Sequence, residues 1–311
     1  MNEVELIARL VPGLPTNGSV VVAAGDDCAV LDLGAPEYVL LKTDAVVEGV
    51  HFTTDTPPGK VGRKALARCL SDIAAMAGRP GSALVTLALP KQFEARHVEA
   101  IYAGLNALAR EHEVAIVGGE TTTNPDRLLI SIALLGTVPK ERCVLRSGAQ
   151  AGDAIFVTGE LGGSLSGKHL DFEPRLAEGR WLREHFPIRS MIDLSDGLAS
   201  DLRHILKASG VGAELMATAI PISRSARRAV RAESSAKPPL LAALTDGEDF
   251  ELLCTVASKQ AVALLDAWKQ RFPGLALTCI GKISAEPGLR LRDHHGVKPL
   301  SVHGYTHFQK S

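Results

Sequence analysis

Residues 59–90, GKVGRKALARCLSDIAAMAGRPGSALVTLALP, contain the pattern that decides the fold: one long helix followed directly by one strand. The helix is predicted to follow Pro57 and Pro58 and to end at Gly78, because proline suits a helix start and glycine a helix end. Residues 82–90 are then an apolar and β-branched run of strand length. A helix that leads into a strand in this way is typical of proteins that mix the two elements.

The same alternation continues on both sides of residues 59–90. Further strands are expected at 19–25, 38–44, 114–119, 127–138, 154–159, 190–195, 250–256 and 276–284, and further helices at 94–112, 197–209 and 259–271. Residues 284–308 look like a closing hairpin with an irregular tail. The polar, turn-rich segment 139–153 separates the two halves. The sequence therefore predicts an α/β protein of the α+β type with two domains, residues 1–140 and 141–311.

Composition excludes several classes of partner. The chain has 311 residues and a net charge of −1, which gives no reason to expect nucleic acid or an anionic membrane surface as a partner. Aromatic residues make up 4% of the chain, too few to suggest a platform for stacking bases. No apolar run approaches the roughly 20 residues that cross a bilayer, and the N-terminus lacks the apolar core of a signal peptide.

Cysteine usage indicates a reducing compartment. The five cysteines are far apart in the sequence, their number is odd, and no C-x-x-C motif occurs. This pattern fits the cytoplasm better than a disulfide framework or a zinc site. We therefore expect a cytoplasmic protein.

Residues 162–169, GGSLSGKH, nearly match a phosphate-binding P-loop. A strand is predicted before the glycines, as such a loop requires, but His169 stands where a Ser or Thr would bind Mg²⁺. The glycines are equally suited to a simple turn into the next helix. A looser role, with backbone N–H groups near a nucleotide, stays open.

Acidic residues recur in short motifs at the ends of predicted strands or in turns, each beside Gly, Ser or Thr. They are Asp26, Asp27, Asp44, Asp72, Glu120, Asp193 and Asp196. Open sheets place ligands beyond the carboxyl ends of their strands, so we expect several of these acids to gather in one site. Clustered carboxylates repel unless cations offset them, and Mg²⁺ prefers oxygen ligands and substrate phosphates. The pattern therefore indicates phosphate chemistry that runs through metal ions.

Each acid taken singly also has a structural interpretation. Asp27 suits an ordinary turn, and Asp196 or Ser195 suits the cap of the following helix. Asp72 follows Arg68 by four residues, as in a surface ion pair, but its surroundings are apolar and a buried acid needs a partner. His51 lies shortly after Asp44; a lone histidine is usually structural, although this one is close to the acidic candidates.

Taken in order, the motifs resemble those of the thiamine-monophosphate kinase family. The motifs are GDDCAV, TDAVVEGVHF, LSDIAAMAG, GGE, LRSGAQAGD, VTGELGGS, IDLSDGL, DGEDFELL and IGKI. That family shares a superfamily with aminoimidazole ribonucleotide synthase and selenophosphate synthetase. The resemblance runs from about residue 3 to residue 308. The ordered set is specific, whereas GDD alone would be weak.

The resemblance implies a phosphotransferase whose acceptor is itself a phosphate group. Such an enzyme moves the γ-phosphoryl group of ATP directly onto thiamine monophosphate, with several Mg²⁺ ions, and yields thiamine diphosphate. It also implies a homodimer whose N-terminal strands join across the interface, with neither nucleic acid nor membrane as a partner. In this family the glycine turn at 159–167 is not a Walker loop, and metals and carboxylates hold the phosphates instead.

Site residues follow from the same resemblance, motif by motif. The implied metal ligands are Asp27, Thr43, Asp44, Asp72, Glu120, Asp193 and Asp196. The implied nucleotide contacts are Gly119, Glu120, Arg146 and Ser195. The implied substrate contacts are His51, Glu248 and Tyr305.

Three residues depart from the family pattern. Glu120 stands in place of an aspartate, Lys42 in place of a small hydroxyl residue near a metal, and Asp246 in place of a glycine. The Lys42 ammonium could replace one Mg²⁺ or point away as a solvated side chain. Two alternative functions therefore stay open: ATP-dependent activation of another small phosphorylated or carbonyl acceptor, and a catalytically inactive nucleotide-binding dimer.

Overall fold

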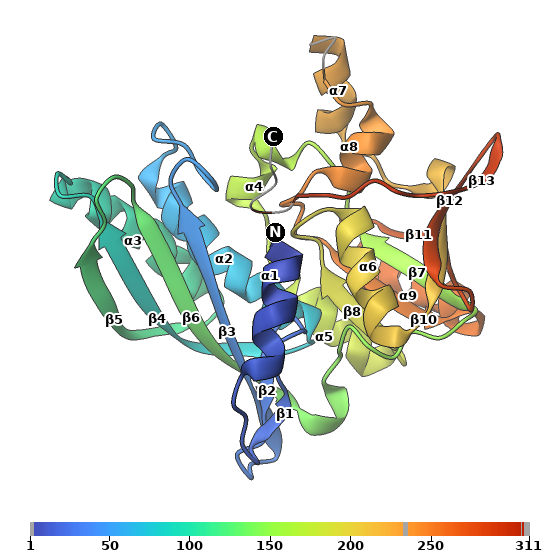
Figure 1. The fold of residues 1–311 in the computed structure, drawn as a ribbon, viewed down its shortest axis with the longest axis horizontal. Coiled ribbons are helices and arrows are strands. Elements are labelled where there is room, and N and C mark those ends of the chain that lie inside the picture. The colour runs from blue at the N-terminus through green and yellow to red at the C-terminus, as the bar shows by residue number, and fades with distance from the viewer. Residues whose placement is uncertain (1–2, 233–235, 306, 308–311) are drawn as a thin grey trace. The chain divides into compact units, whose positions relative to one another are not determined.

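The computed structural model describes residues 3–232, 236–305 and 307, which form two compact units (Figure 1). The six-stranded unit comprises residues 19–143 and 167–180. The seven-stranded unit comprises residues 1–18, 144–166 and 181–311. Each unit is built on one mixed sheet and is described by itself below.

The six-stranded unit has the strand order β1-β2-β3-β6-β4-β5. Its strands are β1 (Val20–Val22), β2 (Ala29–Leu31), β3 (Glu37–Val47), β4 (Arg79–Leu89), β5 (Ala115–Thr123) and β6 (Leu129–Pro139). Only β4 and β5 pair in parallel; the other neighbours are antiparallel. Helices α2 (Pro58–Ala75) and α3 (Ala95–Glu111) pack together and on the sheet, and the short helix α4 (Lys168–Asp171) contacts α2.

Two glycines allow α2 and α3 to approach closely. A Cβ atom on Gly62 would lie 1.9 Å from the carbonyl oxygen of Ile101, and one on Gly104 would lie 1.8 Å from that of Gly59. No real side chain fits at such distances, so the helix contact requires glycine at both positions. Helix α2 is consequently buried along most of its length.

The sheet of this unit has one covered face and one open face. Leu40, Val46 and the even-numbered residues of β6 are buried beneath the helices, as the two-residue period of a strand requires. On the opposite face Leu41, Leu84 and Leu135 are 40–48% exposed. The unit therefore presents an apolar sheet face that none of its own described helices covers.

The seven-stranded unit has the strand order β13-β12-β9-β11-β7-β10-β8. Its strands are β7 (Asp153–Thr158), β8 (Ser190–Asp193), β9 (Gly212–Met216), β10 (Leu252–Ala257), β11 (Leu277–Ser284), β12 (Gly288–Asp293) and β13 (Gly296–Pro299). Only β9 and β12 pair in parallel. Its helices are α1 (Glu3–Leu10), α6 (Leu198–Ser209), α7 (Arg224–Ala232), α8 (Pro239–Thr245) and α9 (Ala261–Arg271); α5 (Leu176–His185) begins in the other unit.

The core of the seven-stranded unit lies between its sheet and α6. Leu198, Leu202 and Ile205 recur at helical spacing and are fully buried against sheet residues such as Ile155 and Val157. Gly210 ends α6 in the left-handed conformation, with φ of 67°. This packing fixes the turn between β8 and α6, where several of the predicted acids lie.

The predicted α/β architecture is confirmed, and the structure shows that it is built on two mixed sheets. The predicted helices and strands all occur, the strand expected at 114–119 extends to Thr123, and the closing hairpin is β12 with β13. No range was predicted for strands β2 and β9 or for helices α1, α4, α5, α7 and α8. Among the described residues, no helix is long and apolar enough to cross a membrane.

Candidate active site

In the six-stranded unit, two predicted metal ligands lie side by side. A carboxylate oxygen of Asp27, in the loop after β1, is within 4.8 Å of one of Asp72, in the last turn of α2. The two residues are only 2% and 6% exposed. Two buried carboxylates this close repel each other, and their oxygens are the donors that a hard divalent cation prefers. The donor set therefore fits a Mg²⁺ ion.

Lys42 reaches into the same acidic group. Its Nζ atom lies 2.8 Å from Oδ1 of Asp72 and 3.9 Å from Oδ1 of Asp44, and Arg68 donates to Oδ2 of Asp44 at 3.5 Å. Burial by itself lowers the pKa of Lys42, but the charges of Asp72 and Asp44 outweigh it and raise this pKa well above its usual range. The charged form of Lys42 is thus favoured, and its ammonium group lies between the carboxylates.

Two other predicted ligands, Thr43 and Glu120, lie elsewhere on the sheet. The side chain of Thr43 points to the opposite face of β3 from Lys42 and Asp44, with its hydroxyl 3.4 Å from that of Ser131. Glu120 is exposed on the edge strand β5, where its Oε1 accepts a hydrogen bond from the backbone N–H of Thr121. The ligand roles of Thr43 and Glu120 stay predictions.

Gly119, a predicted nucleotide contact, must be glycine for steric reasons. A Cβ atom at this position would lie 1.8 Å from the carbonyl oxygen of Val85 on the neighbouring strand. Its backbone is also unusual, with φ of 157°. Without a side chain, the backbone at Gly119 stays accessible to a ligand.

The structure fixes the orientation of His51. Its Nδ1 accepts a hydrogen bond from the backbone N–H of Val47 at 3.1 Å, so the neutral ring carries its proton on Nε2. Its carbonyl oxygen accepts a hydrogen bond from Lys64 at 2.6 Å. Lys64 is completely buried, and its Nζ also lies 2.7 Å from Nδ1 of His169, 105 residues away. No sequence motif singles out Lys64, because a lysine on a helix normally extends into solvent.

In the seven-stranded unit, predicted metal and nucleotide residues share the turn between β8 and α6. Asp193 ends β8, and the turn continues through Ser195 and Asp196. Oδ2 of Asp201, in the first turn of α6, accepts hydrogen bonds from the N–H groups of Asp196 and Gly197 at 3.1 and 3.0 Å. Burial, and then the charges of Asp196 and Asp193, raise the pKa of Asp201 well above its usual range. Asp201 was not among the predicted site residues, although an acid in the first turn of a predicted helix is a recognisable capping signal.

The predicted substrate residues Glu248 and Tyr305 contact this turn through their backbones. The N–H of Glu248 donates to the carbonyl oxygen of Ser195 at 2.7 Å, and that of Tyr305 donates to the carbonyl oxygen of Asp196 at 2.9 Å. Glu248 has φ of 63°, a strained conformation that recurs at functional sites. Arg146 is close enough for its charge to oppose the rise in the pKa of Asp201. The structure therefore brings the six predicted residues of this unit around one turn.

The N–H groups of the glycine turn at 162–163 donate hydrogen bonds to carboxylates of the protein itself. The N–H of Gly162 donates to both carboxylate oxygens of Asp249, at 3.1 and 2.9 Å, and that of Gly163 donates to Asp246 at 3.0 Å. Lys237 contacts the other oxygen of Asp246 at 2.8 Å. Carboxylates thus occupy the positions that phosphate oxygens would take in a Walker loop, which supports the expectation that this stretch is not one.

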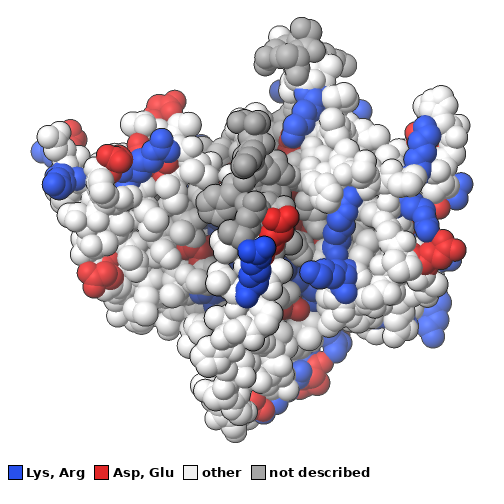
Figure 2. All heavy atoms as spheres, viewed as in Figure 1, with Lys and Arg blue, Asp and Glu red and all other residues white. Residues whose placement is uncertain are grey.

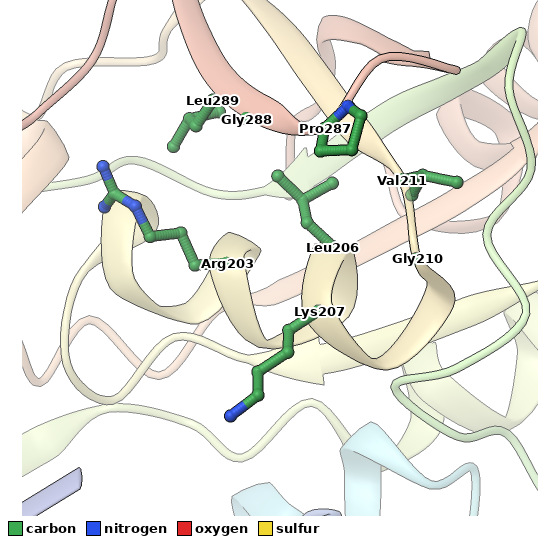
Figure 3. A pocket seen from close by; sticks show the side chains of 8 residues that line it. All are labelled: Arg203, Leu206, Lys207, Gly210, Val211, Pro287, Gly288 and Leu289. Atoms are coloured by element: carbon green, nitrogen blue, oxygen red, sulfur yellow. The ribbon is translucent and has the colours of Figure 1, made fainter. Parts of the chain in front are cut away.

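The hollows in the surface lie outside these groups. One, of about 320 Å³, is lined by Arg203, Leu206, Lys207, Gly210, Val211 and Pro287–Leu289 (Figure 3). Its Arg203 donates to the carbonyl oxygens of Ala199 and Val302, which fixes the guanidinium. A second, of about 410 Å³, lies in the six-stranded unit beside Phe52 and His97. Basic and acidic residues are interspersed on the face in Figure 2, unlike the basic stripe of a nucleic-acid-binding protein.

Comparison with known proteins identifies relatives over nearly the whole chain. Residues 25–138 match the N-terminal domain of AIR synthase related proteins, and residues 166–294 match the C-terminal domain. The thiamine-monophosphate kinase of Rhodopirellula baltica is 41% identical over 87% of this chain and 85% of its own length. That of Escherichia coli strain K12 is 37% identical over 98% of both chains.

Solved structures agree with this likeness. The structure described as AaThiL complexed with AMPPCP and TMP has a TM-score of 0.83 and 30% identity, and the match covers 99% of this chain and 97% of that one. The thiamine-monophosphate kinase of Stenotrophomonas maltophilia K279a has a TM-score of 0.74 and 32% identity over 93% of this chain and 96% of its own.

Proposed function

We propose that this chain, which belongs to the thiamine-monophosphate kinase family, transfers the γ-phosphoryl group of ATP directly onto thiamine monophosphate and forms thiamine diphosphate. The observation that carries this conclusion is identity of 37% over 98% of the chain with a kinase of that name. Buried acids are present in both units, with Asp27 and Asp72 in the six-stranded unit and Asp193 in the seven-stranded unit. ATP is the co-substrate, in keeping with the relative described with AMPPCP.

Metal ions are part of this proposal. Asp27, Asp44 and Asp72 would hold Mg²⁺ in the six-stranded unit, and Asp193 and Asp196 in the seven-stranded unit; Thr43 and Glu120 are proposed as further ligands. When bound, Mg²⁺ neutralises phosphate charge, so that two anionic substrates can approach each other. The carboxylates contribute by binding and orienting the metal–nucleotide complex, as expected for a reaction governed by positioning and charge.

The remaining residues would bind the two substrates. Arg146 offers a planar fork of donors that suits a phosphate, and Gly119, Glu120 and Ser195 are proposed as further nucleotide contacts. The Nε2 proton of His51 can donate to the substrate phosphate, because Val47 occupies Nδ1. Glu248 carries a charge complementary to a cationic thiazolium ring, and the half-exposed ring of Tyr305 offers an aromatic surface.

The direct test mixes the purified chain with ATP, Mg²⁺ and thiamine monophosphate and measures ADP and thiamine diphosphate. Both products are expected in equal amounts. Asp44→Asn should abolish turnover and leave the fold intact, whereas the control Asp32→Asn, at a partly exposed ion pair with Lys140, should keep normal activity. Normal activity in Asp44→Asn would remove the proposed metal role of that residue.

The two alternatives give different results in the same assay. A related enzyme with another acceptor, suggested by Lys42, Glu120 and Asp246, would release ADP with a different phosphorylated or carbonyl compound in an acceptor screen. An inactive nucleotide-binding protein would bind ATP with Mg²⁺ but release no ADP with any acceptor. The retained cluster of buried acids supports an active enzyme, because clustered charge is costly without a ligand.

A homodimer joined through the N-terminal strands is also proposed. The support is the apolar outer face of the six-stranded sheet, where Leu41, Leu84 and Leu135 are exposed. A second copy of the same face would bury these side chains. Light scattering should give twice the chain mass for the wild type and the single mass for Leu135→Glu. The control Val262→Glu, at a 71% exposed position of α9, should stay dimeric.

A cytoplasmic location is the last part of the proposal. The five cysteines, of which Cys28, Cys69 and Cys254 are buried, are all free thiols. Burial raises the pKa of Cys254 to about 12 and keeps this thiol unreactive. Free thiols of this kind suit a reducing compartment.

A further inference from the structure

We propose that Lys42 acts as a built-in cation that takes the place of one divalent metal ion between Asp44 and Asp72. The inference rests on the proposed Mg²⁺-dependent function and concerns how many ions this chain binds. In the family pattern, a small hydroxyl residue at position 42 lies near a metal ion. Here the Lys42 ammonium group would itself supply the positive charge of that ion.

The backbone directs Lys42 into the acidic group. Residues alternate between the two faces of β3, so Lys42 and Asp44 point to the same inner face, on which α2 packs. Asp72 belongs to that helix and is 2.8 Å from the ammonium nitrogen, while Asp44 is 3.9 Å away. One side chain thus lies between two proposed metal ligands.

The Lys42 side chain is mostly shielded from solvent. It is 19% exposed and the Asp72 side chain is 8% exposed, so water screens their attraction only weakly. A lysine that merely pointed away from the site would leave its ammonium group in bulk water. The structure therefore favours the first of the two possibilities for this residue, replacement of an ion.

The local charge balance leads to the same conclusion. Among these five side chains, Asp27, Asp44 and Asp72 contribute −3 and Lys42 and Arg68 contribute +2, which sums to −1. Without Lys42 the balance would be −2. A further divalent ion beside the ammonium would meet its repulsion, and the Asp72 oxygen that it needs already accepts a hydrogen bond from Lys42.

The test counts metal ions instead of measuring turnover. Mn²⁺ is titrated into the full chain with a non-hydrolysable ATP analogue, and free Mn²⁺ is followed by electron paramagnetic resonance. Lys42→Ser, which supplies a hydroxyl and removes the charge, should bind one more Mn²⁺ per chain than the wild type. Lys42→Arg keeps the charge and should give the wild-type number. An unchanged number in Lys42→Ser would overturn the proposal.

Thermal unfolding provides a second measurement that stays informative if a variant is unstable. In EDTA, Lys42→Met should unfold at a lower temperature than the wild type, because three carboxylates then lose one cation. Added Mg²⁺ should raise the midpoint of Lys42→Met more than that of the wild type. Equal midpoints in EDTA, or equal responses to Mg²⁺, would contradict the proposal.

These measurements separate the inference from the proposed function. If Lys42→Ser gains an ion while the wild type fails to phosphorylate thiamine monophosphate, the built-in cation stands and the choice of acceptor is wrong. If the wild type forms thiamine diphosphate and the ion number does not change, the enzyme assignment stands and the role of Lys42 is wrong.

Discussion

The ammonium group of Lys64 donates a hydrogen bond of 2.6 Å to the carbonyl oxygen of His51. The same nitrogen lies 2.7 Å from Nδ1 of His169, and the lysine is completely buried. Burying an ammonium is costly unless hydrogen bonds compensate it. Lys64 therefore ties the turn that carries His51 to helix α2, and both are held against α4.

Replacement of Lys64 by Met should loosen the turn that carries His51. Loss of the donor leaves a buried carbonyl oxygen less well satisfied, so we expect the free energy of unfolding to fall by roughly 1–3 kcal/mol. KM for thiamine monophosphate should rise several-fold while KM for ATP changes little. Urea unfolding and steady-state kinetics measure the two effects.

The matched control is Lys60→Met on the same helix. Lys60 pairs with Asp171 at 2.6 Å, but it is 44% exposed, so its loss should change stability by at most about 1 kcal/mol. Equal effects of the two substitutions would show that the buried position of Lys64 has no special importance.

Gly119→Ala should disturb strand β5 where it passes Val85. The added methyl group would lie 1.8 Å from a carbonyl oxygen, so the two strands must separate. We expect a loss of at least about 2 kcal/mol in the free energy of unfolding, together with weaker nucleotide binding. Gly274→Ala is the control, since a Cβ there has no neighbour within 4 Å. Calorimetry and nucleotide titration should therefore distinguish the two variants.

Asp249→Ala should destabilise the glycine turn at residues 162–163. The buried N–H of Gly162 would lose both carboxylate oxygens that accept from it, at an expected cost of roughly 1–3 kcal/mol. Asp249→Asn keeps one acceptor oxygen and should lose less. Asp266→Ala, at an exposed position of α9, controls for loss of an acid elsewhere. An Asn variant as unstable as the Ala variant would argue against the hydrogen bond as the cause.

Glu173 should contribute a pH-dependent part of the stability. The imidazole of His112, whose Nε2 lies 3.3 Å from Oε1 of Glu173, is the main cause that lowers the pKa of Glu173; burial opposes this shift, and the charges of Arg63 and Arg175 assist it. A lowered folded-state pKa gives stability that is present above the unfolded pKa, about 4.3. This stability is lost as the pH falls through the lower folded-state value.

Comparison of the wild type with Glu173→Gln measures this contribution. The difference in unfolding free energy should shrink as the pH falls below about 5. Because the side chain is 46% exposed, solvent screens the interaction and the difference should not exceed about 1 kcal/mol. A difference that grows as the pH falls would have the wrong sign.

Strong local periodicity explains which elements the sequence predicts. Helix α2 has prolines before it and a glycine after it, and β6 alternates buried and less buried residues along 129–139. Helix α7, with the sequence RSARRAVRA, has four arginines among its nine residues and little apolar surface to mark a buried face. The three residues of β2 are too few to show a period.

The candidate site likewise contains residues that a local motif reveals and contacts that only the folded chain brings together. Asp193, Ser195 and Asp196 are adjacent in the sequence and could be found as one motif. The contact of Gly162 with Asp249 spans 87 residues, and that of Lys64 with His169 spans 105. Contacts of this kind depend on tertiary packing, so neither spacing nor residue type reveals them.

The aromatic cluster beside α9 makes the seven-stranded unit visible to fluorescence. Trp181 and Trp268 are the only tryptophans of the chain; both belong to this unit, and their ring centroids are 5.9 Å apart. Trp268 is almost fully buried, so its emission should shift to longer wavelength when the unit opens. The six-stranded unit contains no tryptophan and does not contribute to this emission. Denaturation followed by tryptophan emission and by circular dichroism will therefore reveal whether the two units melt together or one after the other.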